Sequence, residues 1–285
     1  MAKRKNTSGK GFGGFASILI IALIVLSTLF PGTNKTQETT GYTTAAAVET
    51  TAAATDSAKE TIADDTQTVQ NTNNDSTGKR TDWTEWNESL YPEFYRIVGS
   101  AVIDVTLAPG EIRYSGLDDL GRTGPVEAYL TYEDYEKGRA ERSDISSIKP
   151  SGWTSNKEVA ITFEDGTVYH GYFYNRSHLL AHSLGGDDEK YNMVTGTRCQ
   201  NVGKNDGNGG MQYSEMTVYN YLKNDPDGQV YYLVTPVYEG SELVPRSVIV
   251  DMRSDDGQID QEVEVYNTAP EFTIDYATGE YSQSA

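Results

Sequence analysis

The sequence predicts an α+β fold in which helices pack against a central antiparallel sheet. Three observations lead to this prediction: a β-hairpin signal in the middle of the chain, an amphipathic helical run after it, and a series of strand-like runs toward the C-terminus. The sequence contains no internal repeat. We therefore expect the folded part of the chain to form one domain.

The N-terminus combines a basic segment with an apolar segment. Met1–Gly14 contains four basic residues and no acidic residue, and Phe15–Phe30 is almost entirely apolar. This order is typical of a secretory signal peptide or an N-terminal membrane anchor, which we place at residues 1–32. The apolar run is shorter than the roughly 20 residues usual for a spanning helix, so cleavage and retention both stay open. Either outcome places the remainder outside the cytoplasm.

Residues 33–82 are dominated by Thr, Ala, Asn, Asp, Ser and Gln and contain few large apolar side chains. Such a segment cannot bury enough apolar surface to offset the entropy lost on ordering, so we predict a disordered linker. A cluster of aromatic residues begins at Trp83 and marks the start of the folded domain, residues 83–285. Its length suffices for one sizeable core.

The first half of the domain contains the hairpin signal. Ser115–Gly121 has the composition of a loop, and Val126–Gly138 is expected to form a short helix or a strand followed by a helix. Glu158–Phe163 and Val168–Tyr174 are β-rich and are separated by an Asp-Gly turn, a dipeptide that tolerates the positive φ angles of hairpin turns. We expect the second of these strands to deliver His178 at its end.

The second half of the domain begins with a polar connection rich in Gly and Asn, from Gly185 to Gly210. Met211–Leu222 follows with helical spacing of its apolar side chains. Three further runs are rich in Val, Ile or Tyr and are bounded by Gly, Pro or Asp, which predicts strands: Val230–Glu239, Arg246–Met252 and Glu262–Tyr266.

The formal net charge of −19 argues against nucleic-acid binding, because proteins that bind nucleic acids usually present a basic surface. Basic and acidic residues cancel before Trp83, so the acidic excess lies in the folded domain. Residues 134–223 are close to neutral, whereas residues 239–285 contain only Arg246 and Arg253 against many acidic side chains. The excess therefore lies mainly outside the segment that contains the candidate catalytic residues.

Few residues could act as a nucleophile or a general base. A zinc protease motif H-E-x-x-H fails because Leu179 occupies the Glu position. A serine triad is disfavoured because G-x-S-x-G is absent and Ser177 is adjacent to His178. The single cysteine, Cys199, excludes an intramolecular disulfide and leaves a Cys-His protease as one alternative. The chain has only three histidines: His170, His178 and His182.

Hydrolysis of a phosphodiester needs a base that can deprotonate water near neutral pH, which suits histidine. It also benefits from a hard divalent cation that stabilises negative charge at the departing oxygen. Mg²⁺ accepts one or two oxygen ligands from a protein and retains several waters. Asn201 and Glu215 could supply such ligands. Arginines suited to phosphate oxygens are also present, although spacing alone does not bring these groups together: Arg142, Arg176 and Arg198.

A resemblance to a known family connects these residues. It is carried by three stretches, Tyr174–Ala181, Asn192–Asn201 and Gly210–Glu215, with support from Leu117–Gly124 and Pro150–Trp153. Together they resemble the DNA/RNA non-specific endonuclease family, in particular the branch of bacterial DNA-entry nucleases and secreted streptococcal DNases. The family signature is often D-R-G-H. The quartet Asn175–His178 departs from it at two positions but is similar to the N-R-S-H variant of the secreted DNases.

The resemblance implies a ββα-metal nuclease core, with the hairpin ending in His178 as the two strands and the segment near Asn201 as the helix. It implies that His178 is the general base, that Asn201 binds Mg²⁺ directly, with Mn²⁺ as a possible substitute, and that Glu215 holds a metal-bound water. Asn192 would position the histidine or the substrate. Cys199 would be a packed residue. The remaining residues expected at the site are Arg176, with a catalytic role, and the substrate-binding set Arg142, Arg198 and Gln200.

These inferences together predict an extracellular or surface-anchored, metal-dependent endonuclease that hydrolyses DNA, and also RNA, without sequence specificity. Its partners would be nucleic acids and, if the N-terminal segment is uncleaved, the cell membrane. Little base preference is expected from a site that contacts the phosphate backbone. Two alternatives remain from the residues alone. One is a non-catalytic stalked module that binds a glycan or a protein at the surface, and the other is an exported peptidoglycan hydrolase or peptidase.

Overall fold

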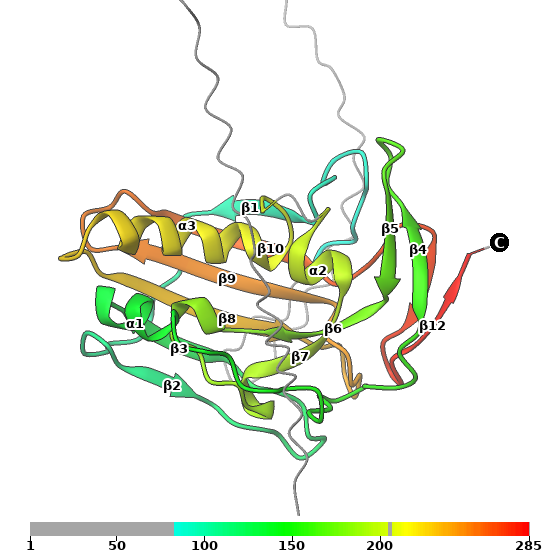
Figure 1. Cartoon of the computed structure of the whole chain (residues 1–285), viewed down its shortest axis with the longest axis horizontal. Coiled ribbons are helices and arrows are strands. Elements are labelled where there is room, and N and C mark those ends of the chain that lie inside the picture. Colours follow the sequence, from blue (N-terminus) through cyan, green and yellow to red (C-terminus); the bar gives the residue numbers. More distant parts are fainter. Residues whose placement is uncertain (1–82, 205–206, 285) are drawn as a thin grey trace, which may run out of the picture. The chain divides into compact units, whose positions relative to one another are not determined.

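The computed structural model describes residues 83–204 and 207–284. The predicted signal or anchor at 1–32 and the linker at 33–82 lie outside the described residues. Within the described part of the chain, no helix is both long and apolar enough to cross a bilayer. The described domain contains a large antiparallel sheet, three two-stranded sheets and a small number of helices (Figure 1). The predicted α+β class is thus confirmed.

The large sheet has six strands in the order β1-β10-β9-β8-β3-β2, and every neighbouring pair is antiparallel. The three strands predicted near the C-terminus form its centre, and their ends lie within a few residues of the predicted ones. The predicted strand-to-helix segment is also confirmed, because a strand and a helix occupy it in turn. The strands are β1 (Tyr95–Gly99), β2 (Ile112–Tyr114), β3 (Val126–Leu130), β8 (Val230–Val237), β9 (Ser247–Ser254) and β10 (Asp260–Tyr266).

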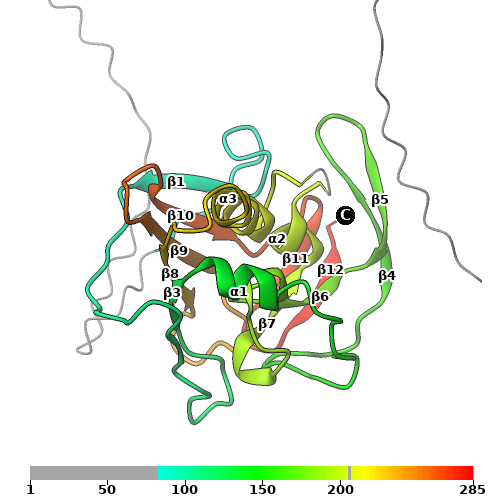
Figure 2. The ribbon, with the colours of Figure 1, turned by 60° about the vertical axis from the view of Figure 1, so that its left-hand side comes forward.

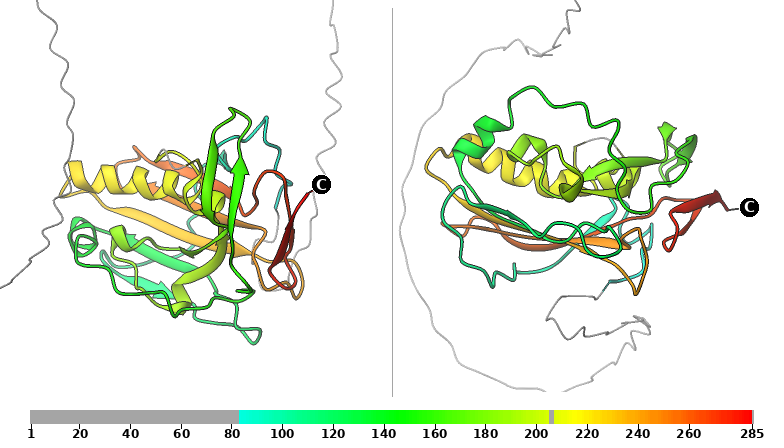
Figure 3. Two further views of the ribbon diagram at one scale, coloured as in Figure 1. Left: turned by 45° about the vertical axis from the view of Figure 1, so that its right-hand side comes forward. Right: turned by 90° about the horizontal axis from the view of Figure 1, so that it is seen from below.

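Both faces of the central strands are covered. On one face, α1 (Tyr132–Lys137) and α3 (Met211–Asn224) pack over the sheet, and Figure 3 shows this helical layer in the view from below. The predicted helix at 211–222 is therefore confirmed and is slightly longer than expected. On the other face, the segment after β1 crosses the sheet, where the Val102 amide donates to Asp251 at 2.7 Å and Leu107 is buried. Apolar side chains of β8, β9 and β10 fill the core beneath the helices.

The predicted hairpin is present as β4 (Glu158–Thr162) and β5 (Val168–Tyr172), joined by a turn in which Gly166 adopts a φ of +80°. It projects from the domain as a two-stranded sheet of its own (Figure 1, Figure 2). Its inner face packs in a second cluster that contains Ile161 and Phe173.

The expectation that this hairpin itself ends in His178 was wrong. The chain leaves β5 at Phe173, and a new strand, β6 (Tyr174–His178), pairs with β7 (Met193–Thr197) instead. The richness of residues 185–210 in Gly and Asn predicts a polar connection, but β7 lies within this stretch. All five residues of β7 are buried. Their polar side chains are satisfied inside the protein, because the Thr195 hydroxyl donates to the Ser151 carbonyl and the Thr197 hydroxyl donates to the Thr268 carbonyl. Hydrogen bonds to distant segments therefore stabilise β7, although its sequence lacks an amphipathic pattern.

The C-terminal segment adds another two-stranded sheet that was not predicted, β11 (Phe272–Asp275) with β12 (Glu280–Gln283). Tyr281 stacks on Phe173 with ring centroids 4.0 Å apart, and its hydroxyl accepts a hydrogen bond from the Lys157 amide at 2.8 Å. β12 therefore supports the junction between β5 and β6.

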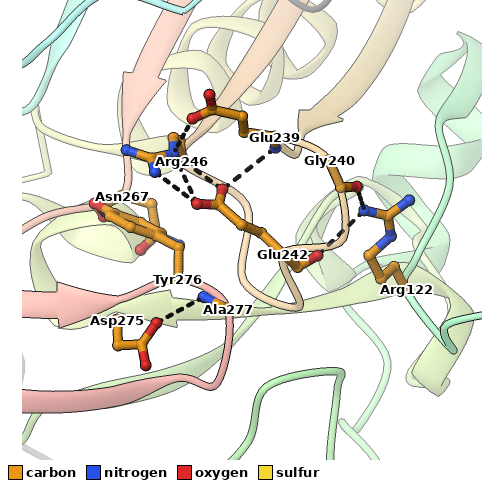
Figure 4. A network of polar contacts seen from close by, with 9 residues as sticks. All are labelled: Arg122, Glu239, Gly240, Glu242, Arg246, Asn267, Asp275, Tyr276 and Ala277. Atoms are coloured by element: carbon orange, nitrogen blue, oxygen red, sulfur yellow. Dashed lines mark hydrogen bonds and ion pairs between the residues drawn. The ribbon is translucent and has the colours of Figure 1, made fainter.

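An ionic network fixes the turn between β8 and β9 against this C-terminal segment (Figure 4). Arg246 pairs with Glu239 at 3.1 Å and with Glu242 at 2.6 Å, and it lies against the ring of Tyr276. Arg122 donates to the carbonyl of Gly240 at 2.9 Å and to that of Glu242 at 3.2 Å. The network joins three segments that are distant in sequence.

Asn267, the residue after β10, joins the β6–β7 pair to the large sheet. Its side-chain oxygen accepts the Thr197 amide at 2.8 Å, and its side-chain nitrogen donates to the carbonyls of Thr195 at 3.0 Å and Pro245 at 2.8 Å. Asn267 is fully buried, so water cannot replace these hydrogen bonds.

We expect Asn267→Ala to lower the free energy of unfolding by about 2–3 kcal/mol, because three buried backbone groups lose their partner. Urea denaturation followed by circular dichroism measures this. Asn220→Ala is the matched control, because Asn220 is exposed on α3, and it should change stability little. Equal stability of the two variants would contradict the bracing role of Asn267.

Candidate active site

The candidate site is built on a β-β-α unit. β6 and β7 are antiparallel with His178 opposite Met193, and β7 leads directly into the short helix α2 (Arg198–Val202). Thr197 caps this helix, since its hydroxyl accepts the Gln200 amide at 2.9 Å. α2 packs against β6, β7 and α3. The unit therefore brings the end of β6, the helix α2 and the start of α3 together, as the ββα expectation required, with β6 and β7 as the strands.

His178 lies at the end of β6 and is only 6% exposed. Its Nε2 is 2.9 Å from an Asp188 carboxylate oxygen. Burial lowers the pKa of His178, and the positive charge of Arg142 lowers it further, against the opposing effect of Asp188. The imidazole is therefore neutral at physiological pH, which is the state that a general base requires.

Asp188 was not identified from the sequence. It lies between β6 and β7, in the segment predicted as a polar connection. One carboxylate oxygen contacts His178, and the other accepts the Ser143 amide at 2.8 Å and lies 3.3 Å from Nδ1 of His182. Partial burial raises its pKa, but the hydrogen bonds from Ser143 and His178 outweigh burial, so the pKa lies below its ordinary value. Asp188 is thus an ionised carboxylate beside the histidine.

Asn192 is fully buried and holds the backbone that follows His178. Its side chain accepts the Leu180 amide at 2.9 Å and donates to the carbonyls of Leu180 at 2.8 Å and Asp187 at 2.9 Å. Both the nitrogen and the oxygen of the carboxamide therefore form hydrogen bonds to the backbone. The structure therefore places Asn192 as a support for the chain on either side of His178 and Asp188, and not as a surface group.

Asn201 lies on α2 and Glu215 on α3, and both side chains are partly exposed. Within the described residues, no hydrogen bond is formed by the Asn201 carboxamide. The Glu215 carboxyl lies deep among protein atoms although part of the side chain reaches solvent, and burial raises its pKa to about 7. The charge of Arg142 acts on both Glu215 and His178, so Arg142 lies close to both groups.

The other predicted site residues lie in different surroundings. Arg176 donates to the carbonyls of Ser146 and Ile148 and stacks 4.3 Å from the ring centre of Trp153. Arg198 lies 5.1 Å from the ring centre of Tyr169.

Gln200 is fully buried, and a side chain at Gly196 would collide with it. The structure thus argues against direct substrate contact by Gln200. Cys199 is also fully buried, and burial raises the pKa of its thiol, which does not suit a nucleophile.

The oxygen donors at this site fit a hard divalent cation. The Asn201 carboxamide and the Glu215 carboxyl both offer oxygen, and the high pKa of Glu215 reflects a desolvated charge that a cation would stabilise. In the described part of the chain, no group of three or more His, Cys, Asp and Glu is arranged to hold a metal.

Comparison with known proteins gives consistent results. A family model described as DNA/RNA non-specific endonuclease matches residues 102–256, which include His178, Asn201 and Glu215. A deoxyribonuclease from Streptococcus dysgalactiae subsp. equisimilis is 32% identical, and the similarity covers 68% of each chain.

Two solved structures resemble the described domain. The Sda1 nuclease with a bound zinc ion superimposes with a TM-score of 0.66 and 34% identity, covering 70% of this chain and 100% of that chain. NucA from Streptococcus agalactiae with a magnesium ion bound gives a TM-score of 0.51 and 26% identity, covering 65% and 84% of the two chains.

We expect Glu215→Gln to stabilise the metal-free protein at about pH 8 but not at about pH 5. The folded state holds the Glu215 proton up to a pKa of about 7 instead of the usual 4.5. The stability linked to this carboxyl is therefore fully present below pH 4.5 and is lost as the pH rises through about 7. Allowing for solvent screening of a partly exposed side chain, the gain at the higher pH is roughly 1–3 kcal/mol.

Urea denaturation in EDTA measures this difference. Glu141→Gln is the control, because Glu141 is exposed and should have the same small effect at both pH values. A gain for Glu215→Gln that does not depend on pH would contradict the assigned surroundings of the carboxyl.

Proposed function

The chain belongs to the DNA/RNA non-specific endonuclease family, and we propose that it is a metal-dependent endonuclease that hydrolyses phosphodiester bonds of DNA and RNA without sequence specificity. The observation that carries this proposal is a neutral, buried His178 at the end of a β-β-α unit, with Arg142 close to both His178 and Glu215. The deoxyribonuclease relative supports DNA as a substrate.

His178 is the general base of the proposed reaction. An O–H bond of a water molecule breaks, its proton moves to the imidazole, and the oxygen attacks phosphorus. The bond from phosphorus to the 3′ oxygen then breaks, and that oxygen gains a proton from solvent. A base with a pKa below the operating pH is unprotonated and ready for each cycle, which is the state that burial gives to His178.

We assign the metal to Asn201 and Glu215. The Asn201 carboxamide oxygen would be the direct ligand, and Glu215 would hold a water of the cation. When bound, the cation stabilises the negative charge that develops on the phosphate and the 3′ oxygen. Oxygen ligands favour Mg²⁺, with Mn²⁺ as a substitute. The similar structures contain zinc in one case and magnesium in the other, so the metal requires a direct test.

The arginines have different proposed roles. Arg142 is exposed and lies close to His178 and Glu215, so we assign it to the phosphate next to the reacting water. Arg198, at the start of α2, contacts a neighbouring phosphate. Arg176 uses its guanidinium on the carbonyls of Ser146 and Ile148, so its role is to position the segment that follows Arg142.

We propose that the enzyme acts outside the cytoplasm, which the basic and apolar N-terminal segment supports. Contacts to phosphates explain the lack of base preference. Because the protein has a net charge of −19, affinity for nucleic acid depends on a few local arginines. It should therefore fall as salt screens them.

We expect His178→Ala to lower the rate of plasmid nicking by roughly 10²–10⁴-fold, because the base is lost. The assay uses residues 81–285 and supercoiled plasmid at low salt, with Mg²⁺ or with EDTA. His170→Ala is the matched control, since His170 is exposed on β5, and it should cut at the wild-type rate. Undiminished cutting by His178→Ala would remove His178 from the mechanism. Absence of cutting by folded wild-type protein with several metals would instead favour the non-catalytic surface module.

Asn201→Ala should lower both Mg²⁺ affinity and activity, because the direct ligand is lost. Asn201→Asp keeps an oxygen and should recover part of both. Isothermal titration with Mg²⁺ and the dependence of nicking on metal concentration measure the two effects. If Asn201→Ala binds Mg²⁺ and cuts as the wild type does, the ligand assignment is wrong.

A further inference from the structure

We propose that Asp188 is a positioning residue that fixes the tautomer of His178 and joins this base to the segment that carries Arg142. The inference rests on the proposed function of His178 as the base, and it assigns a role to a carboxylate that the proposed reaction leaves unused.

The two ring nitrogens of His178 have different surroundings, because only Nε2 contacts Asp188. An ionised carboxylate can only accept hydrogen bonds. The 2.9 Å contact between Asp188 and Nε2 therefore places the proton of the neutral ring on Nε2. The lone pair then lies on Nδ1, which forms no hydrogen bond within the described residues. Nδ1 is thus the atom that takes the proton from water.

Transfer of a proton from water to His178 creates a positive charge on the ring. When Nδ1 gains a proton, the ring becomes an imidazolium, and Asp188 lies opposite its Nε2–H. The carboxylate stabilises this cation without taking the proton, as the aspartate does in serine protease triads. Arg142 and His182 act in the opposite direction on the same ring. Asp188 therefore favours the protonated form of His178, whereas Arg142 and His182 oppose it.

The other carboxylate oxygen of Asp188 contacts the segment that carries Arg142. It accepts the Ser143 amide at 2.8 Å, and Ser143 follows Arg142 directly. The same oxygen lies 3.3 Å from Nδ1 of His182, whose Nε2 is 3.2 Å from the Ala140 carbonyl. The segment 140–143 is therefore tied to Asp188 at two points. One carboxylate sets both the base and the position of the arginine beside it.

Neighbouring acidic residues do not share this arrangement. Asp187 is exposed and its carboxylate accepts the Tyr191 hydroxyl at 2.8 Å, while Glu189 is exposed. Glu189→Gln therefore removes the same charge one residue away without touching His178, and it is a matched control for Asp188→Asn.

We expect Asp188→Asn to lower kcat for plasmid or oligonucleotide cleavage by roughly 10²–10⁴-fold while changing KM less than kcat. The acid limb of the pH–rate profile should move to lower pH, because the carboxylate that raises the pKa of His178 is gone while Arg142 and His182 still lower it. Glu189→Gln should retain the wild-type kcat and profile. A role limited to folding would lower the amount of active enzyme and leave the profile in place.

The tautomer is tested without activity. In wild-type protein labelled with ¹⁵N at histidine, imidazole chemical shifts above the pKa should show His178 protonated on Nε2. In Asp188→Asn they should show a mixture or a shift toward Nδ1–H. If the wild-type protein cut no nucleic acid, the proposed function would fail while the tautomer measurement still stood. A wild-type Nδ1–H tautomer, or Asp188→Asn with unchanged kcat and pH profile, would overturn the role of Asp188.

Discussion

The candidate site depends on the contacts that hold β6 and β7 in place, because this two-stranded sheet is separate from the large sheet. An isolated pair of strands is marginally stable in water, and β6–β7 carries His178 at its end. Asn267 ties β7 to the end of β10, and Asn192 ties the chain after β6 to the chain before β7. Both side chains are fully buried. The position of His178 therefore follows from two buried carboxamides, because water cannot substitute for their hydrogen bonds.

The electrostatics of the site follow from the same burial. Desolvation keeps His178 neutral and makes ionised Glu215 costly in the metal-free protein. The positive charge of Arg142 stabilises the ionised form of Glu215 and favours the neutral form of His178. A cation bound beside Glu215, as proposed, would stabilise the same carboxylate charge that Arg142 stabilises. An acidic protein can thus present a local surface suited to phosphate.

The sequence predicted the features that have a local cause. Asp165-Gly166 predicted a turn, the apolar spacing after Met211 predicted α3, and the Val-rich and Ile-rich runs predicted β8, β9 and β10. The family resemblance predicted the roles of His178, Asn201 and Glu215. It could not identify Asp188, because a polar residue in a Gly-rich segment gives no local sign of its contacts with His178 and Ser143. β7 and Asn267 were missed for the same reason, since their hydrogen bonds join residues about 70 positions apart.

The late position of Asn267 in the chain has a consequence for truncated forms of this protein. A chain is synthesised from its N-terminus, so His178, Asn201 and Glu215 all emerge before the residue that holds β7 in place. Tyr281, which stacks on Phe173 beside β6, emerges later still. A chain cut short before Asn267 therefore retains every residue proposed for the site but lacks the buried carboxamide that holds β7.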